Sequence, residues 1–123
     1  MRGWRLSAAA EQDIIIVLAY TAREFGELAR ARYEALLAVA LRDIADDPGR
    51  AGSIPRPELG DGIRSYHLRN SRRRVRGGLG LVRRPRHLIL YRPINPSLVG
   101  IGRVLHDGMD LERHLPENFG EHL

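Results

Sequence analysis

The N-terminal half of the chain alternates apolar and polar positions at the period of an α-helix. From residue 8 to residue 25 an apolar side chain recurs every three or four positions, and the same spacing resumes from residue 29 to residue 44. Ser7 stands where a helix N-cap belongs, Gly26 interrupts the pattern, and Pro48 cannot continue a helix. The pattern therefore predicts a helical hairpin. The stripe on the first helix comprises Ile14, Leu18 and Phe25, with Ile15 and Ala22 beside it.

The C-terminal half has the shorter alternation that is typical of β-strands. Because the links between these strands are too short for a crossover, consecutive strands are expected to pair antiparallel. Residues 49–62 are interpreted as a loop, and Pro116 ends a last short helix that begins at Asp107 or Gly108. The predicted class is α+β, a single domain over residues 1–123 in which an N-terminal strand and the helical hairpin pack on a small antiparallel sheet. The expected strands are residues 4–6, 63–69, 87–92 and 98–105, with a further strand or irregular edge at 79–82.

Charge is distributed very unevenly along the chain. All 20 basic side chains are arginine, against 15 acidic residues, which gives a formal net charge of +5. Residues 62–106 hold 11 of the arginines and no acidic residue. A surface of this kind is expected to meet an acidic partner. The absence of cysteine excludes disulfide scaffolds, thiolate metal sites and cysteine nucleophiles.

No segment of the chain has the pattern of a membrane or export signal. The longest apolar run, Ile14 to Tyr20, is far shorter than the ~20 residues of a membrane-spanning helix. The first residues also lack the apolar region and cleavage site of a secretory signal. We therefore expect a cytoplasmic protein with no membrane association.

Several short strings along the chain follow one another in a recognisable order. Residues 4–14 read WRLSAAAEQDI and residues 25–33 read FGELARARY, and they are followed by RSYHLR, RHLILYR, IGRVLH and MDLERHL. In this order the strings resemble the ParE branch of the RelE/ParE superfamily, the toxins of type II toxin–antitoxin modules. The chain departs from the family in the long connection at residues 70–83, which contains the arginine run from Arg72 to Arg76.

The resemblance implies two alternative activities. ParE-like relatives are associated with poisoning DNA gyrase, whereas RelE-like relatives cleave messenger RNA on the ribosome. Cleavage needs a general base, a general acid and cations for the phosphate, and the chain has no lysine and no acidic residue in its basic segment. We therefore expect a toxin that is not an enzyme, with the endoribonuclease as the alternative and a toxin that only binds its antitoxin as a third reading. The residues of a nuclease would be His67, Arg86, Tyr91 and His106.

The resemblance also implies partners. Toxins of this type are neutralised by a disordered antitoxin tail that folds onto them, so a ParD-like antitoxin is expected in a hetero-oligomer, and DNA gyrase is the expected target. We expect no metal and no cofactor, and no direct sequence-specific binding of nucleic acid, since no predicted helix carries the basic residues. Candidate target-binding residues are Arg64, Arg72, Arg73, Arg74, Arg86, Arg92, Arg103, Met109 and Asp110. Candidate antitoxin-binding residues are Trp4, Tyr20, Tyr33 and Leu37.

Overall fold

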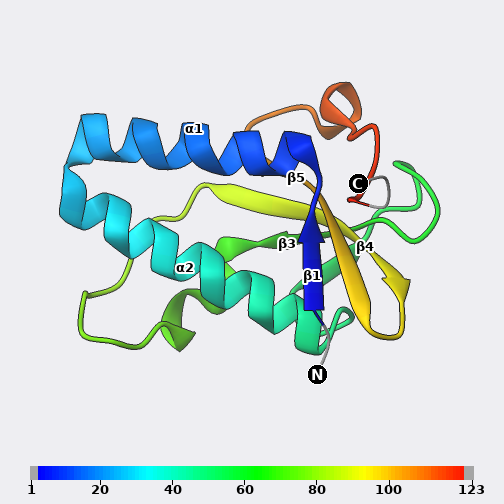
Figure 1. Ribbon diagram of the computed structural model, residues 1–123, viewed down its shortest axis with the longest axis horizontal. Coiled ribbons are helices and arrows are strands. Elements are labelled where there is room, and N and C mark those ends of the chain that lie inside the picture. Colours follow the sequence, from blue (N-terminus) through cyan, green and yellow to red (C-terminus); the bar gives the residue numbers. More distant parts are fainter. Residues whose placement is uncertain (1–2, 121–123) are drawn as a thin grey trace.

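The computed structural model describes residues 3–120, in which two long helices cover one face of a five-stranded sheet (Figure 1). This arrangement confirms the predicted α+β class and the helical hairpin. The elements in chain order are β1 (Gly3–Leu6), α1 (Ala8–Phe25), α2 (Glu27–Asp46), β2 (Ser53–Pro55), β3 (Arg64–His67), the 3-10 helix η1 (Leu68–Arg74), β4 (His87–Asn95), β5 (Leu98–His106) and the 3-10 helix η2 (Leu111–His114).

Local signals place the ends of the helical hairpin. The hydroxyl of Ser7 accepts a hydrogen bond from the Ala10 backbone N–H at 3.0 Å and donates one to the Gly102 carbonyl at 2.7 Å, so the start of α1 is fastened to β5. Gly26, with φ +93°, ends α1 and begins the turn into α2. The predicted apolar stripe is wrong at Phe25, which is 70% exposed. The hairpin turn extends beyond the ends of the strands (Figure 1), and the ring of Phe25 packs edge to face against Tyr20 of the same helix.

The sheet has the order β1-β5-β4-β3-β2, and its pairs are antiparallel except for β1 with β5, which is parallel. The expectation of a purely antiparallel sheet is therefore corrected at its first strand. That expectation rested on short links between consecutive strands. The rule does not apply to β1, because both helices and three strands separate it from β5 in the sequence.

Three further segments differ from the prediction. The expected loop contains β2, whose pairing with β3 brings its Pro55 to the edge of the sheet, where a missing N–H group is tolerated. The strand expected over residues 63–69 is cut short by η1. Residues 79–82, expected as a strand or an irregular edge, are irregular and so do not count among the differences. The last helix is the single turn η2. Each of these outcomes depends on contacts with distant residues rather than on the local apolar period.

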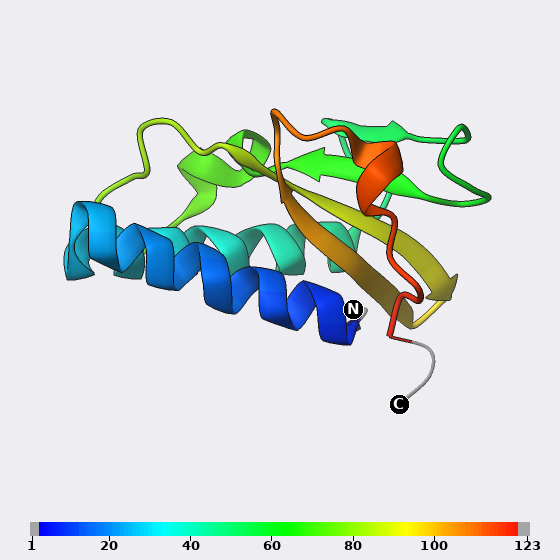
Figure 2. The same ribbon diagram turned by 90° about the horizontal axis from the view of Figure 1, so that it is seen from above.

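The sheet is covered on both faces (Figure 2). The larger core lies between the helices and the sheet, and a smaller one lies on the opposite face, where the C-terminal segment crosses β5. Here Phe119 is 4% exposed and packs against Gly102. A Cβ atom at Gly102 would lie 2.6 Å from Phe119 Cε1 and 2.6 Å from Pro116 Cγ, so only glycine accommodates this contact. The larger core consists of Ala10, Tyr33, Leu36, Leu37, Ala40, Leu41, Ile44, Tyr66, Leu68, Ile89, Tyr91, Val99, Ile101 and Val104.

Substitution of Gly102 is expected to destabilise the fold through this contact. Gly102→Ala should lower the free energy of unfolding by about 1–3 kcal/mol, the usual cost of an overpacked core. Urea denaturation measures the change. Gly3→Ala is the matched control, since a Cβ atom there meets nothing within 4 Å. Equal unfolding midpoints for the two variants would contradict the tight seating of Phe119.

Candidate functional site

Three strands bring a histidine each to the same end of the sheet. β3 ends at His67, β4 begins at His87 and β5 ends at His106. The register pairs His87 with His106 and His67 with Leu88, so the three imidazoles are neighbours although they lie far apart in the sequence. Asp107 follows β5 directly and completes a cluster of polar side chains.

Asp107 is the centre of this cluster. Its carboxylate accepts a hydrogen bond from His67 Nε2 at 2.9 Å and from Arg86 Nε and NH2 at 3.1 and 2.9 Å. The hydrogen bonds from Arg86 and then from His67 lower the pKa of Asp107 to about 2. The sequence prediction missed Asp107 because it lies one residue outside the acid-free segment. Its position directly after His106 was the available signal.

The hydrogen bonds assign the proton positions of two of the imidazoles. His67 Nδ1 accepts the backbone N–H of Arg69 at 3.1 Å, and His106 Nδ1 accepts that of Gly108 at 3.0 Å. An imidazole that accepts at Nδ1 carries its proton at Nε2. His67 therefore donates from Nε2 to the carboxylate, and both of its nitrogens are occupied.

The third imidazole is held by Tyr33. The Tyr33 hydroxyl accepts the backbone N–H of Arg86 at 3.2 Å and also forms a hydrogen bond with His87 Nδ1, 2.6 Å away. Burial raises the pKa of Tyr33 to about 12. Burial, with a smaller contribution from His106, lowers the pKa of His87 to about 4. His87 is therefore neutral at physiological pH.

The cluster is poorly suited to proton transfer with a substrate. All three Nδ1 atoms take part in internal hydrogen bonds, and only His106, with 43% of its side chain exposed, is open to solvent to a large extent. Of the residues expected for a nuclease, the structure gathers His67, Arg86 and His106. Tyr91 is not part of the cluster, because it lies four residues after His87 along β4. Its side chain is fully buried, and its hydroxyl forms hydrogen bonds with the Pro48 carbonyl and the Ser53 hydroxyl.

The basic segment is less free than its composition predicts. Arg103 Nε lies 2.7 Å from Asp13, and Arg74 Nε lies 2.9 Å from the buried Asp43. The expectation that these arginines lack compensating acids is therefore corrected, because carboxylates from outside residues 62–106 pair with them. Arg86 is paired in the same way with Asp107. Arg86 therefore has a structural role, and it stays a candidate for contact with the target.

Three further candidate arginines of the basic segment also have internal contacts. Arg64 Nε donates to the Ser53 hydroxyl at 2.7 Å, and Arg72 Nε donates to the Val82 carbonyl. The guanidinium of Arg92 lies 4.6 Å from the centre of the Phe119 ring. Of the nine candidates for target binding, Arg73 alone is an exposed arginine with no ion pair to the described residues.

The sequence from residue 4 to residue 111 matches the family described as the ParE toxin of the type II toxin–antitoxin system parDE. The chain belongs to the ParE toxin family. It is the toxin of a toxin–antitoxin pair, and the family implies an antitoxin partner. The match confirms the resemblance carried by the order of the sequence strings. No curated protein matches the chain well enough to narrow the assignment.

The antitoxin-binding candidates of this ParE toxin divide into two groups. Tyr33 and Leu37 are 7% and 3% exposed and belong to the core, so they offer little surface to a partner. Trp4 and Tyr20 are 40% and 50% exposed. The sequence could not separate the groups, because all four are apolar residues at helix or strand spacing.

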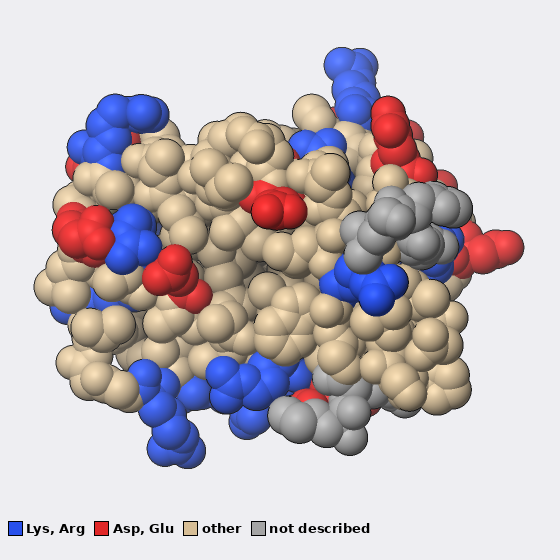
Figure 3. All heavy atoms as spheres, in the orientation of Figure 1, with Lys and Arg blue, Asp and Glu red and all other residues tan. Residues whose placement is uncertain are grey.

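The outer side of α1 is an apolar surface in this ParE toxin. Ala10 is the only buried residue of the helix, whereas Ile15, Ile16 and Tyr20 are 54%, 57% and 50% exposed. Figure 3 shows this helical face, on which charged side chains are sparse across the middle. The sequence pattern predicted that Ile15 lies beside the buried stripe of α1. The helix instead packs through Ala10 and the partly buried Ile14, Val17 and Leu18.

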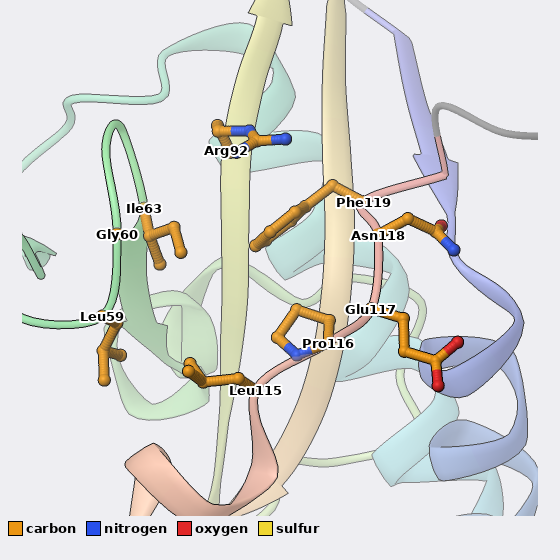
Figure 4. Close-up of a pocket in the computed structure, with 9 residues that line it drawn as sticks. All are labelled: Leu59, Gly60, Ile63, Arg92, Leu115, Pro116, Glu117, Asn118 and Phe119. Carbon is orange, nitrogen blue, oxygen red and sulfur yellow. The ribbon is translucent and has the colours of Figure 1, made fainter.

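The last two target-binding candidates lie beside η2. Met109 is 43% exposed. The Asp110 side chain accepts the backbone N–H of Glu112 at 3.3 Å and lies 3.5 Å from Arg113 Nε, so it caps η2. A hollow of about 340 Å³ lies nearby, on the face of the sheet that is turned away from the two long helices (Figure 4). Its lining residues are Leu59, Gly60, Ile63, Arg92, Leu115, Pro116, Glu117, Asn118 and Phe119.

Two kinds of site are not found within residues 3–120. No cluster of three or more His, Asp or Glu side chains there has the arrangement needed to hold a metal ion. Over the same residues, no helix is both long and apolar enough to cross a bilayer.

The buried neutral His87 predicts a specific pH dependence of stability. Its pKa is about 4 in the folded toxin and 6.5 when unperturbed, so only the unfolded chain takes up this proton between those values. The free energy of unfolding should therefore fall as pH drops from about 6.5 to about 4. His87→Gln should remove this contribution, which urea denaturation at several pH values measures.

Asp107 acts in a separate and lower range. Its pKa of about 2 lies below the ordinary 3.8, so its contribution is present above that ordinary value and is lost as pH falls toward 2. That lower decline should remain in His87→Gln. His114→Gln, an imidazole outside the cluster, is the control and should keep both ranges. A profile for His87→Gln that matches wild type would contradict the buried neutral imidazole.

Proposed function

We propose that this ParE toxin inhibits DNA gyrase in the cytoplasm and is neutralised by a cognate ParD-like antitoxin. The observation that carries the proposal is the family match over residues 4–111. The ParE branch is the part of the superfamily whose resemblance implies gyrase as the target. On this proposal the toxin acts by binding and not by catalysis.

The histidine cluster supports binding over catalysis. A phosphodiester-cleaving site requires a group that can accept a proton from the attacking hydroxyl. His67 has no free nitrogen, and the Nδ1 of His87 is occupied by a tyrosine whose pKa is about 12. His106 alone cannot serve as both base and acid in one step. The arrangement rather fastens the ends of three strands to one another.

The gyrase proposal predicts damage to DNA in a purified system. Folded toxin without antitoxin, added to gyrase, ATP and relaxed plasmid, should reduce supercoiling and cause linear, cleaved plasmid to accumulate on a gel. Toxin premixed with excess antitoxin is the control and should leave supercoiling unchanged. His67→Ala and His106→Ala should retain the effect, since neither residue is proposed to act chemically.

Two other outcomes would overturn this proposal. Intact plasmid together with ribosome-dependent cleavage of messenger RNA, abolished by His106→Ala, would assign the endoribonuclease activity instead. A folded toxin that leaves both plasmid and RNA intact would be a protein that only binds its antitoxin.

We further propose that the antitoxin covers the outer side of α1. Ile16 and Tyr20 are one helical turn apart and both are about half exposed, so they can enter the apolar face of an amphipathic partner helix. Trp4 lies in β1, one of the two edge strands of the sheet, next to the start of the same helix. An extended antitoxin segment can pair with that edge.

The α1 surface predicts which substitutions weaken the complex. Ile16→Glu should raise the dissociation constant of the antitoxin by at least about tenfold, because burial of an isoleucine side chain contributes roughly 1.5–3 kcal/mol. Ile54→Glu is the matched control. Ile54 is 47% exposed but lies in β2, at the opposite edge of the sheet. The Ile54→Glu variant should therefore bind the antitoxin with unchanged affinity. Titration calorimetry that finds equal losses for both variants would contradict the assignment.

A further inference from the structure

Within the basic segment, residues 62–106, five arginines have side chains that form neither an ion pair nor a hydrogen bond with the described residues. They lie in η1 and in the connection from η1 to β4, and all are exposed. None of them makes an ion pair within the part of the chain that the structure describes, and residues 68–86 contain no acidic residue. We call this surface the basic edge. Its members are Arg69, Arg73, Arg76, Arg83 and Arg84.

The basic edge accounts for the whole excess charge of the protein. The chain has 20 arginines and 15 acidic residues, so outside these five the two kinds of charge are equal in number. Figure 1 shows η1 and the following loop at the lower left, below α2, and arginine side chains project along the same border of the molecule in Figure 3. The net charge of +5 is therefore concentrated rather than spread over the surface.

The 3-10 helix η1, which carries Arg69 and Arg73, is held in place by buried hydrogen bonds. The carboxylate of Asp43 on α2 accepts hydrogen bonds from Arg74 Nε at 2.9 Å and from the Ser71 hydroxyl at 2.6 Å. Ser71 is fully buried, and its hydroxyl also bonds to Tyr66 at 2.8 Å. These contacts hold η1 against α2, and they leave Arg69 and Arg73 on the outside.

The connection after η1 is fastened in the same way. Arg72 Nε donates to the carbonyl of Val82, which closes the loop on itself. Arg32 of α2 donates from Nε to the carbonyl of Leu79 at 2.5 Å. The inward arginines thus fix the path of the backbone. The arginines of the basic edge point outward from this backbone, and within residues 3–120 their side chains make no ion pair or hydrogen bond that stabilises the fold.

The chemistry of the basic edge fits phosphate groups. Guanidinium groups donate several hydrogen bonds to phosphate oxygens and accept none. Residues 68–86 include no aromatic side chain, so this surface has no platform on which bases stack. It is also not a helix of the kind that enters a major groove, since η1 is a single short 3-10 segment. The contacts that remain available are those to the backbone of nucleic acid, which carry no sequence information.

We propose that the basic edge binds the phosphate backbone of double-stranded DNA without regard to sequence. The inference deepens the proposed function, because an inhibitor of gyrase meets its target together with the duplex that gyrase holds. The arginines would contact that duplex while the rest of the toxin contacts protein.

The test is binding of the full-length toxin, free of antitoxin, to a fluorescent DNA duplex of arbitrary sequence. Fluorescence anisotropy between about 50 and 200 mM salt gives the slope of log K against log salt, which is about −0.9 for each phosphate contacted. The triple variant Arg73→Gln, Arg76→Gln, Arg83→Gln should weaken binding and reduce the magnitude of this slope by about 3, roughly one for each lost contact. Urea denaturation should show that its stability is unchanged.

The matched control removes the same charge elsewhere. Arg5, Arg23 and Arg113 are exposed and lie outside the basic edge, so their triple replacement by Gln leaves the same net charge as the test variant. It should retain most of the affinity and nearly all of the salt slope. Equal losses in the two triple variants would overturn the inference, since binding would then follow net charge alone.

Two probes address other polyanions. Tighter binding to poly-glutamate than to the duplex would overturn the inference in favour of an acidic protein, and binding to single-stranded RNA but not to the duplex would overturn it in favour of RNA. The assay contains no gyrase. If the toxin fails to bind duplex but still causes gyrase to cleave plasmid, the proposed function stands and the basic edge does not carry it.

Discussion

The arrangement of the helical layer on the C-terminal half depends on one buried carboxylate, that of Asp43. This side chain is 4% exposed near the end of α2, and it meets Arg50 at 3.3 Å and Arg74 at 2.9 Å. A buried carboxylate destabilises the fold unless cations and hydrogen-bond donors replace the water it has lost. The end of α2, the loop that leads to β2, and η1 must therefore converge on it. Loss of the carboxylate would leave two guanidinium groups facing each other without a counter-charge.

The same logic fixes two other junctions. Asp13 of α1 binds Arg103 of β5, and one of its oxygens also accepts the Val104 backbone N–H at 3.0 Å, so the first helix is tied to a central strand. Asp107 joins the ends of β3, β4 and β5 through His67 and Arg86. In each case an acid outside the arginine-rich segment pairs with an arginine inside it. Some arginines of this segment thus form ion pairs that hold the fold together, and others remain without an acidic partner among the described residues.

Local physics explains which parts of the fold were predictable from the sequence. The 3.6-residue period, the Ser7 cap and the glycine at residue 26 define the hairpin, and alternation defines β4 and β5, because these signals act within a few residues. The strand β2 and the 3-10 helix η1 were missed because pairing with β3 and contact with Asp43 determine them. The site was predicted less well for the same reason. Arg103 and Asp13 are 90 residues apart in the sequence, and a count of charges along the chain cannot pair them.

The two surfaces proposed for partners rely on different physics, and this constrains how neutralisation can work. The outer side of α1 offers apolar area, whose contribution to binding depends little on salt, whereas the basic edge offers charge, whose contribution falls steeply with salt. They belong to different elements, and α2 lies against both, through the hairpin and through the Arg32 contact with Leu79. An antitoxin seated on α1 therefore leaves the arginines of the basic edge outside its apolar contact. On these two proposals, neutralisation follows from keeping the toxin body away from its target, and the charge proposed to bind DNA need not be cancelled for the pair to be harmless.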